Sequence, residues 1–161
     1  MTFQGSVEAI HLAAEPGSSP MAVAEALAEA GLGLRGDRYF GRPKKDGSPE
    51  PEAALTLIEA ESLEALSALQ VAAGRDPLAP GASRRNVTTR GVPLNHLVGR
   101  LFRVGGVLCR GFELCEPCRH LEALTVPGVR TGLVHRGGLR GWILEGGVIR
   151  VGDAITPVDA A

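Results

Sequence analysis

The sequence is poor in cysteine, in aromatic residues and in long hydrophobic stretches. It has three cysteines in 161 residues, and only 4% of its residues are aromatic. Three thiols are too few for the disulfide framework of a small secreted protein, and no apolar run approaches the roughly 20 residues of a transmembrane helix. The amino terminus has neither a basic start nor a continuous apolar stretch, so it does not resemble a signal peptide. We therefore expect a cytoplasmic protein with no membrane partner.

An excess of charge of either sign is also absent. Seventeen basic residues stand against eighteen acidic residues, which leaves a formal net charge of -1. A chain with this balance has no global attraction for nucleic acid, so no nucleic-acid partner is expected. Hydrophobic residues make up 44% and charged residues 22%, as in ordinary globular proteins. The length suits one domain that spans residues 1–161.

Glycine and proline are plentiful, with 22 and 11 residues, which suits short strands joined by turns. Residues 5–13 alternate apolar and polar side chains and predict a first strand, and residues 86–91 predict another. Two segments, 101–111 and 142–153, each hold a Gly-Gly pair between alternating arms, which favours the tight turn of a β-hairpin. These features predict a mainly β protein, a β-barrel with a few short peripheral helices.

One helix is predicted with a definite start. Leucine and isoleucine recur at helical intervals within residues 55–70, and Thr56 and Glu59 have the spacing of a capping box. The helix is therefore predicted to begin at Thr56. The Ala/Glu pattern of residues 21–30 also fits helical spacing but ends in glycines, so its structure stays open. Residues 41–53, with three prolines and no apolar periodicity, predict an exposed loop.

The cysteine chemistry is concentrated in one short segment. Cys115 and Cys118 form a Cys-x-x-Cys pair directly after a predicted strand, and Arg119 and His120 follow. Pro117 suits the first turn of a helix. Backbone N–H groups at such a position, together with neighbouring cations, favour the thiolate form of cysteine. A thiolate is both a nucleophile and a soft metal ligand.

Other interpretations of the cysteines remain open. Free cysteines are usually small buried side chains, and Cys109 on a predicted strand is interpreted in this way. The Cys-x-x-Cys pair is compatible with a zinc site completed by Cys109 and His120, although structural zinc usually takes two well-separated ligand pairs. It is also compatible with a dithiol redox protein, although Pro127 and Gly128 leave little room for the helix of a thioredoxin-like fold. A non-enzymatic binding barrel is a further alternative.

Several segments together resemble the MOSC domain. This domain forms the C-terminal part of molybdenum cofactor sulfurases, occurs alone in bacteria, and is found in molybdenum-dependent reductases of N-hydroxylated compounds. The resemblance rests on GLGLRGDRYFG at 31–41, LTLIEAE at 55–61, RRNVTTRGVPLNHLVGRLFRVG at 84–105, LCEPC at 114–118 and GGVIRVGD at 146–153. The family's invariant cysteine falls on Cys118, and its Arg-x-Asn element falls on Arg84 and Asn86.

The resemblance implies a β-barrel that carries the molybdenum cofactor, which is molybdopterin with its metal. Cys118 would either ligate molybdenum in an oxidoreductase or hold a persulfide sulfur in a sulfur-transfer protein. Cys115, Arg119 and His120 would be accessory to it. The chain lacks the pyridoxal-phosphate domain of the sulfurases, so the expected partners are a sulfur donor or an electron-donor protein, together with a small-molecule substrate.

The resemblance also assigns residues that would hold the cofactor. Its phosphate needs forked cationic donors, which Arg38, Arg84 and Arg85 would supply. Asn86 would orient the pterin or brace its loop through hydrogen bonds. Asp37 belongs to a Gly-Asp-Arg turn of the family, where it would contact the ligand or stabilise the turn.

Overall fold

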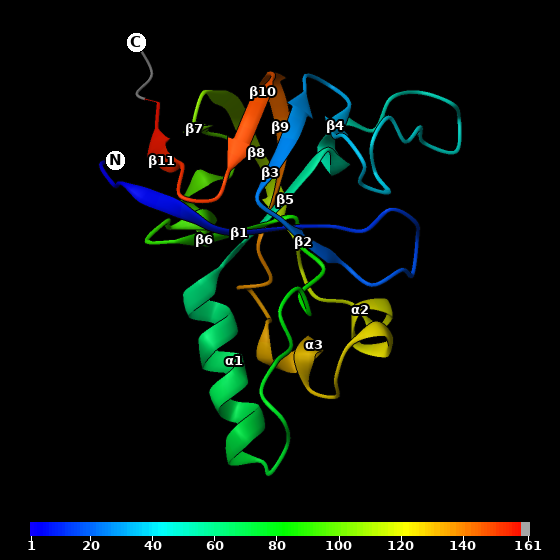
Figure 1. Cartoon of the computed structure of the whole chain (residues 1–161), viewed down its shortest axis with the longest axis vertical. Coiled ribbons are helices and arrows are strands. Elements are labelled where there is room, and N and C mark those ends of the chain that lie inside the picture. The colour runs from blue at the N-terminus through cyan, green and yellow to red at the C-terminus, as the bar shows by residue number, and fades with distance from the viewer. Residues whose placement is uncertain (159–161) are drawn as a thin grey trace.

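The computed structural model describes residues 1–158, so the last three residues of the predicted domain lie outside the described part (Figure 1). Seven strands close into a barrel in the order β1 (Gly5–Leu12), β6 (Val87–Arg90), β5 (Leu55–Glu59), β9 (Leu139–Glu145), β8 (Val107–Leu114), β7 (Leu101–Val104) and β11 (Ala154–Pro157). The barrel closes because β11 also pairs with β1. All pairs are antiparallel except β5 with β6. The predicted mainly β barrel is confirmed.

Four further strands complete the sheets. β2 (Met21–Val23) extends the far end of β1, and a separate sheet has the order β10 (Gly147–Arg150), β3 (Glu25–Glu29), β4 (Gly33–Leu34). Residues 21–30, whose structure the sequence leaves open, therefore form strands. Ala26 and Ala28 are buried while Glu25 and Leu27 are exposed, so the segment follows the two-residue period of a strand.

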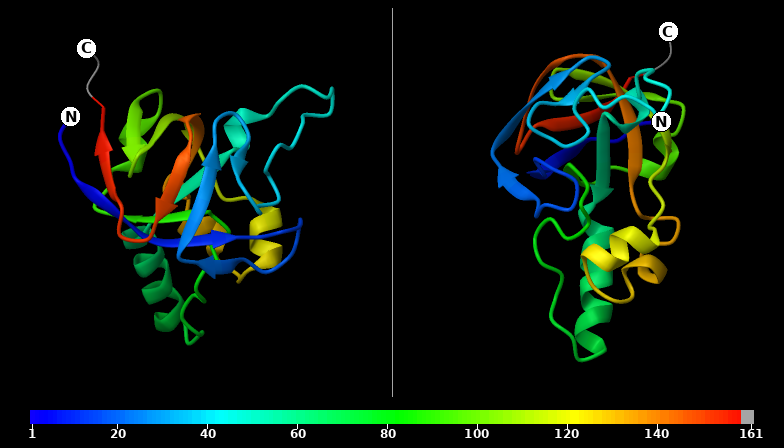
Figure 2. Two further views of the ribbon diagram at one scale, coloured as in Figure 1. Left: turned by 45° about the horizontal axis from the view of Figure 1, so that its top comes forward. Right: turned by 90° about the vertical axis from the view of Figure 1, so that its right-hand side faces the viewer.

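The helices lie together at one end of the barrel (Figures 1 and 2). They are α1 (Ala60–Ala72), α2 (Arg119–Leu124) and α3 (Val129–Gly132). The chain also forms two short 3₁₀ turns, η1 (Pro51–Ala53) and η2 (Leu94–Leu97). Strand β5 separates two hydrophobic cores, because its neighbouring residues Leu57 and Ile58 are both fully buried on opposite faces. No helix within residues 1–158 is both long and apolar enough to cross a membrane.

The predicted start of the long helix is wrong. Strand β5 occupies residues 55–59, and α1 begins at Ala60. Thr56 is buried in the strand, where its Oγ1 donates a hydrogen bond to Oδ1 of Asn86 at 2.9 Å and caps nothing. The apolar residues near Leu57 imitate a helical period because β5 has a core on each side, and pairing with β6 and β9 holds the segment extended.

Only one of the two predicted hairpins forms. β7 and β8 pair through a turn in which Gly105 has a φ of 56°, as a tight hairpin turn requires. The second prediction is wrong, because β10 pairs with β3 and β9 pairs with β5 and β8. A Cβ atom on Gly146 would lie 2.6 Å from the carbonyl oxygen of Ala28, so this glycine permits a close approach of two segments.

Candidate functional site

Cys118 lies in a pocket of about 350 Å³ that four distant parts of the chain form together. They are the loop after β1, the turn and loop at residues 38–42, the loop before β6, and the segment that leads from β8 into α2. Arg140 on β9 completes the lining. The β1–β2 loop and α2 lie on the same side of the molecule in Figures 1 and 2. The volume lies within the roughly 300–1,000 Å³ of small-molecule sites.

The backbone holds Cys118 at the start of α2. Its φ of -129° is extended, and its Sγ accepts a hydrogen bond from the backbone N–H of Leu121 at 3.4 Å, so the thiol caps the helix. Pro117 precedes the cap, so it lies just outside the helix and not in its first turn, where the sequence places it. The side chain remains exposed, so the sulfur is fixed in position and reachable from solvent.

Five arginines line the same pocket, and three of them are the predicted Arg38, Arg84 and Arg85. Arg84 is only 8% exposed, and burial together with the nearby Arg38 lowers its pKa. Its Nη1 donates to the carbonyl oxygen of Ser18 at 2.8 Å, while Nη2 of Arg38 donates to the carbonyl oxygen of Arg84 at 3.3 Å. An arginine nevertheless stays protonated in proteins, so the pocket concentrates positive charge.

Arg85 connects the loop before β6 to the cysteine segment. Its Nε donates to the carbonyl oxygen of Gly137 at 2.9 Å, and its Nη2 donates to that of Cys115 at 2.8 Å. A guanidinium carries five N–H donors, so these bonds hold the group in place and leave others for a ligand. Arg85 is therefore both a support for the Cys118 segment and a possible contact for an anion.

Residues Tyr39, Arg42, Arg140 and Glu116 also line the pocket, and sequence reasoning did not find them. The guanidinium carbons of Arg38 and Arg42 lie 4.5 and 5.3 Å from the centre of the Tyr39 ring, within cation–π range. Arg42 belongs to the predicted loop 41–53. Arg140 lies between residues 84 and 150, where the chain has many arginines and no lysine. No local pattern separates either from an ordinary surface arginine.

Three predicted residues do not line the pocket. Asn86 is 2% exposed, and its Oδ1 accepts hydrogen bonds from the backbone N–H and the Oγ1 of Thr56, so it braces the barrel. Asp37 accepts hydrogen bonds from the backbone N–H groups of Ala13 and Tyr39, which stabilises the turn that carries Arg38. Arg119 is exposed outside the pocket, whereas its neighbour His120 lines it.

The backbone is strained at two places next to the pocket. Arg84 has a φ of 56° and His135 a φ of 60°, and within residues 1–158 no other non-glycine residue has a positive φ. Arg84 lines the pocket itself, and the backbone N–H of His135 donates to Oε2 of Glu116 at 3.0 Å. Left-handed backbone of this kind at non-glycine residues gathers at functional sites. It supports this pocket as the functional site.

The alternative sites are not formed in the part of the chain that the structure describes. No three histidine, cysteine, aspartate or glutamate side chains there lie close enough to hold a metal ion, which removes the zinc site of Cys109, Cys115, Cys118 and His120. Cys109 is fully buried inside the barrel, and desolvation raises its pKa to about 12. α2 has only six residues, and the barrel is not a thioredoxin-like sheet.

Solved structures of several bacterial proteins share this fold. The YuaD protein of Bacillus subtilis is 18% identical, with a TM-score of 0.77 over 100% of this chain and 99% of its own. YiiM of Geobacillus stearothermophilus is 17% identical, with a TM-score of 0.69 over 96% of this chain and 75% of its own. YiiM of Escherichia coli is 18% identical, with a TM-score of 0.68 over 100% and 71%.

No curated protein sequence matches the chain. The sequence model of the MOSC domain matches residues 41–156, which is most of the chain. This match includes Arg84, Arg85, Cys118 and Arg140 of the pocket. The protein therefore belongs to the MOSC domain family.

Proposed function

We propose that this MOSC domain binds the molybdenum cofactor in the pocket of Cys118. The observation that carries the proposal is an exposed thiol in a pocket that five arginines line. Arginine suits the bidentate binding of phosphate, and a thiolate suits a soft metal. The pocket arginines would bind the phosphate of the cofactor, and Cys118 would face its metal.

The side chains that line the pocket fit this group. Arg38, Arg84 and Arg85 are anchored through backbone carbonyl groups, so they lose little side-chain freedom when an anion binds. Tyr39 offers an aromatic surface between two guanidinium groups. When bound, the molybdenum centre would supply redox chemistry to a small-molecule substrate. The protein would supply binding, orientation and positive charge.

A second candidate function is sulfur transfer, in which Cys118 carries a persulfide. The exposure of Cys118 favours it, because a carried sulfur must be reached by both a donor and an acceptor. The arginines would then stabilise the persulfide anion, and a sulfur donor protein would be the partner. Both candidates need Cys118, and they differ in whether the pocket retains molybdenum and pterin.

The test is to purify the protein from a host that makes the cofactor and to measure three quantities. They are molybdenum by metal analysis, pterin by the fluorescence of its released oxidised form, and labile sulfur by cyanolysis. We expect molybdenum with pterin in the wild type and at least about tenfold less molybdenum in Cys118→Ser, since the metal loses its thiolate ligand.

The matched control is Cys115→Ala, because Cys115 is buried and supplies its backbone carbonyl to the site. This variant should keep molybdenum, pterin and sulfur at wild-type levels if Cys115 is accessory. Labile sulfur on Cys118 without molybdenum or pterin would contradict cofactor binding and support sulfur transfer. If all three quantities are absent from a folded wild-type protein, both candidate functions are wrong.

A further inference from the structure

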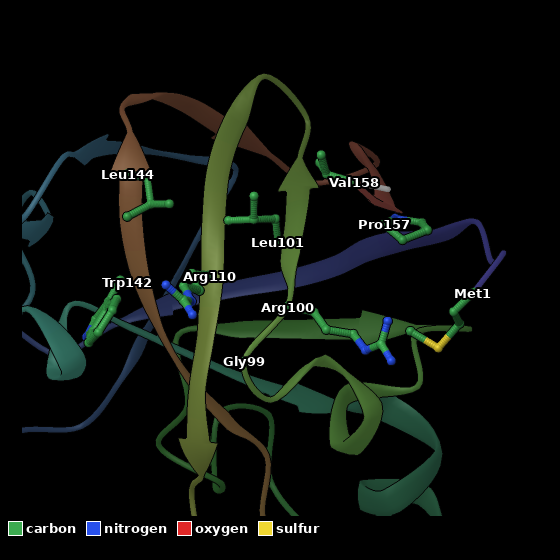
Figure 3. A pocket seen from close by; sticks show the side chains of 9 residues that line it. All are labelled: Met1, Gly99, Arg100, Leu101, Arg110, Trp142, Leu144, Pro157 and Val158. Carbon is green, nitrogen blue, oxygen red and sulfur yellow. The ribbon is translucent and has the colours of Figure 1, made fainter. Parts of the chain in front are cut away.

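A second pocket, of about 550 Å³, lies on the outer face of the barrel over β7, β8 and β9 (Figure 3). Leu101, Arg110 and Trp142 form one row across these strands, because Leu101 pairs with Arg110 and Arg110 pairs with Trp142. Paired residues of neighbouring strands point to the same face of a sheet. The pocket is therefore built on rigid strands.

Most of the pocket surface is apolar. Leu101, Leu144, Pro157 and Val158 surround it, and Trp142 forms one side (Figure 3). The Trp142 ring is held by stacking on Phe112, with the ring centres 5.4 Å apart and the planes at 24°. Trp142 is the single tryptophan of the chain. A rigid aromatic wall beside aliphatic side chains suits the apolar body of a small ligand.

Two exposed arginines, Arg100 and Arg110, also line this pocket, and none of the acidic residues within positions 1–158 does. Neither forms an ion pair with any residue of the described part of the chain. By contrast, Arg103 on β7 pairs with Glu145 at 3.2 Å, and Arg150 on β10 pairs with Glu25 at 3.1 Å. The guanidinium carbon of Arg110 lies 5.9 Å from the centre of the Trp142 ring. Positive charge thus borders the apolar surface, and no described residue forms an ion pair with it.

We propose that this pocket binds a small organic anion with an apolar body, of which a medium-chain carboxylate is the simplest example. The carboxylate would pair with Arg110 in the forked geometry that guanidinium groups favour, while the chain would pack on Trp142 and Leu144. Arg100 points toward Met1 on the other side of the pocket (Figure 3) and would add positive charge there. This pocket is separate from that of Cys118. The two pockets share no lining residue, although Arg140 of the Cys118 pocket and Trp142 lie only two residues apart on the same outward side of β9.

The proposal is tested by titrating the purified protein with octanoate, octan-1-ol and octylammonium chloride. Binding is followed by the fluorescence of Trp142 and, independently, by isothermal titration calorimetry. The three compounds share one alkyl chain and differ in charge. We expect octanoate to bind at least about tenfold more tightly than octanol, because it alone places a negative charge against the guanidinium groups. Octylammonium should bind most weakly.

The variants Arg100→Gln and Arg110→Gln should each weaken octanoate binding, and the double variant should bind octanoate no better than octanol. Arg103→Gln is the matched control, because Arg103 is on the same strand as Leu101 and pairs with Glu145 outside the pocket. It should bind octanoate like the wild type. The proposal is wrong if octanol or octylammonium binds as tightly as octanoate, or if the double variant keeps the preference. It is also wrong if sedimentation shows a dimer whose interface covers Trp142 and excludes octanoate.

Discussion

The backbone N–H of His135 donates a hydrogen bond to Oε2 of Glu116 at 3.0 Å, and Nδ1 of the same histidine lies 3.2 Å from Oε1. Glu116 is the one acidic side chain among the residues that line the arginine pocket of Cys118. The strained His135 therefore restrains a carboxylate that would otherwise be free to compete with an anionic ligand for the arginines.

The two residues of this contact should affect anion binding in opposite directions. Glu116→Gln should tighten the binding of inorganic phosphate about two- to fivefold, because it removes a negative charge from the pocket. His135→Ala should weaken phosphate binding slightly, because it keeps the backbone N–H bond but removes the Nδ1 contact and so loosens the carboxylate. Calorimetric titration measures both, and Glu122→Gln, outside the pocket, is the control. Weaker phosphate binding by Glu116→Gln would contradict this role.

The three cysteines should differ in reactivity toward iodoacetamide at pH 8. Cys118 is exposed and should be alkylated first, whereas Cys115 is 3% exposed. Cys109 is fully buried with a pKa raised to about 12, so it stays a neutral thiol at this pH. Mass spectrometry should find one rapid modification in the folded protein and three in urea. Cys118→Ser should remove the rapid one, and a rapid reaction at Cys115 would refute its assignment as an accessory residue.

Asn86 should matter for stability more than for ligand contact. Asn86→Ala leaves the buried N–H and Oγ1 of Thr56 without their acceptor, and we expect the free energy of unfolding to fall by roughly 2–3 kcal/mol. Urea denaturation measures this change. Gln4→Ala, at an exposed position, should change the unfolding free energy by less than about 0.5 kcal/mol. A fully stable Asn86→Ala variant that loses cofactor would instead make Asn86 a ligand residue.

His11 should make the protein sensitive to mild acid. It is 6% exposed, its Nδ1 has no hydrogen-bond partner within the described residues, and burial lowers its pKa below 6.5. Below pH 6.5 the unfolded chain takes up a proton that the folded protein resists, so stability is full above pH 6.5 and falls as the pH drops through the lowered pKa. Thermal melts at pH 7.5 and 5 should show a smaller loss for His11→Gln than for the wild type.

His96→Gln is the control for this comparison, since His96 is exposed. It should lose as much stability between the two pH values as the wild type does. An equal acid sensitivity of His11→Gln and the wild type would show that other groups cause it. Glu8 and Glu64, which line a third pocket together with His11 and pair with Arg90, are then the next residues to test.

Local patterns in the sequence predict those elements whose partners are close along the chain. The alternation in residues 5–13 predicts β1, and the glycine pair after Val104 predicts the β7–β8 hairpin, because a short turn leaves few other pairings. The same local signal fails at Gly146. There the pairing of β10 with β3, far away in the chain, is favoured over a hairpin with β9.

The sequence likewise predicts some features of the Cys118 pocket, whereas others follow only from the tertiary structure. Pro117 and Cys118 together predict a thiol at a helix start, and the resemblance to the MOSC domain singles out Cys118. The sequence alone does not decide between ligand binding and bracing for Asn86, since an amide can do either. Its burial and its hydrogen bonds to Thr56, which only the structure shows, favour bracing. Arg42 and Arg140 reach the Cys118 pocket only because the closed barrel brings a distant loop and the start of β9 together at one end. These segments meet because strands that are far apart in the sequence pair with one another, and no local sequence pattern predicts such pairs.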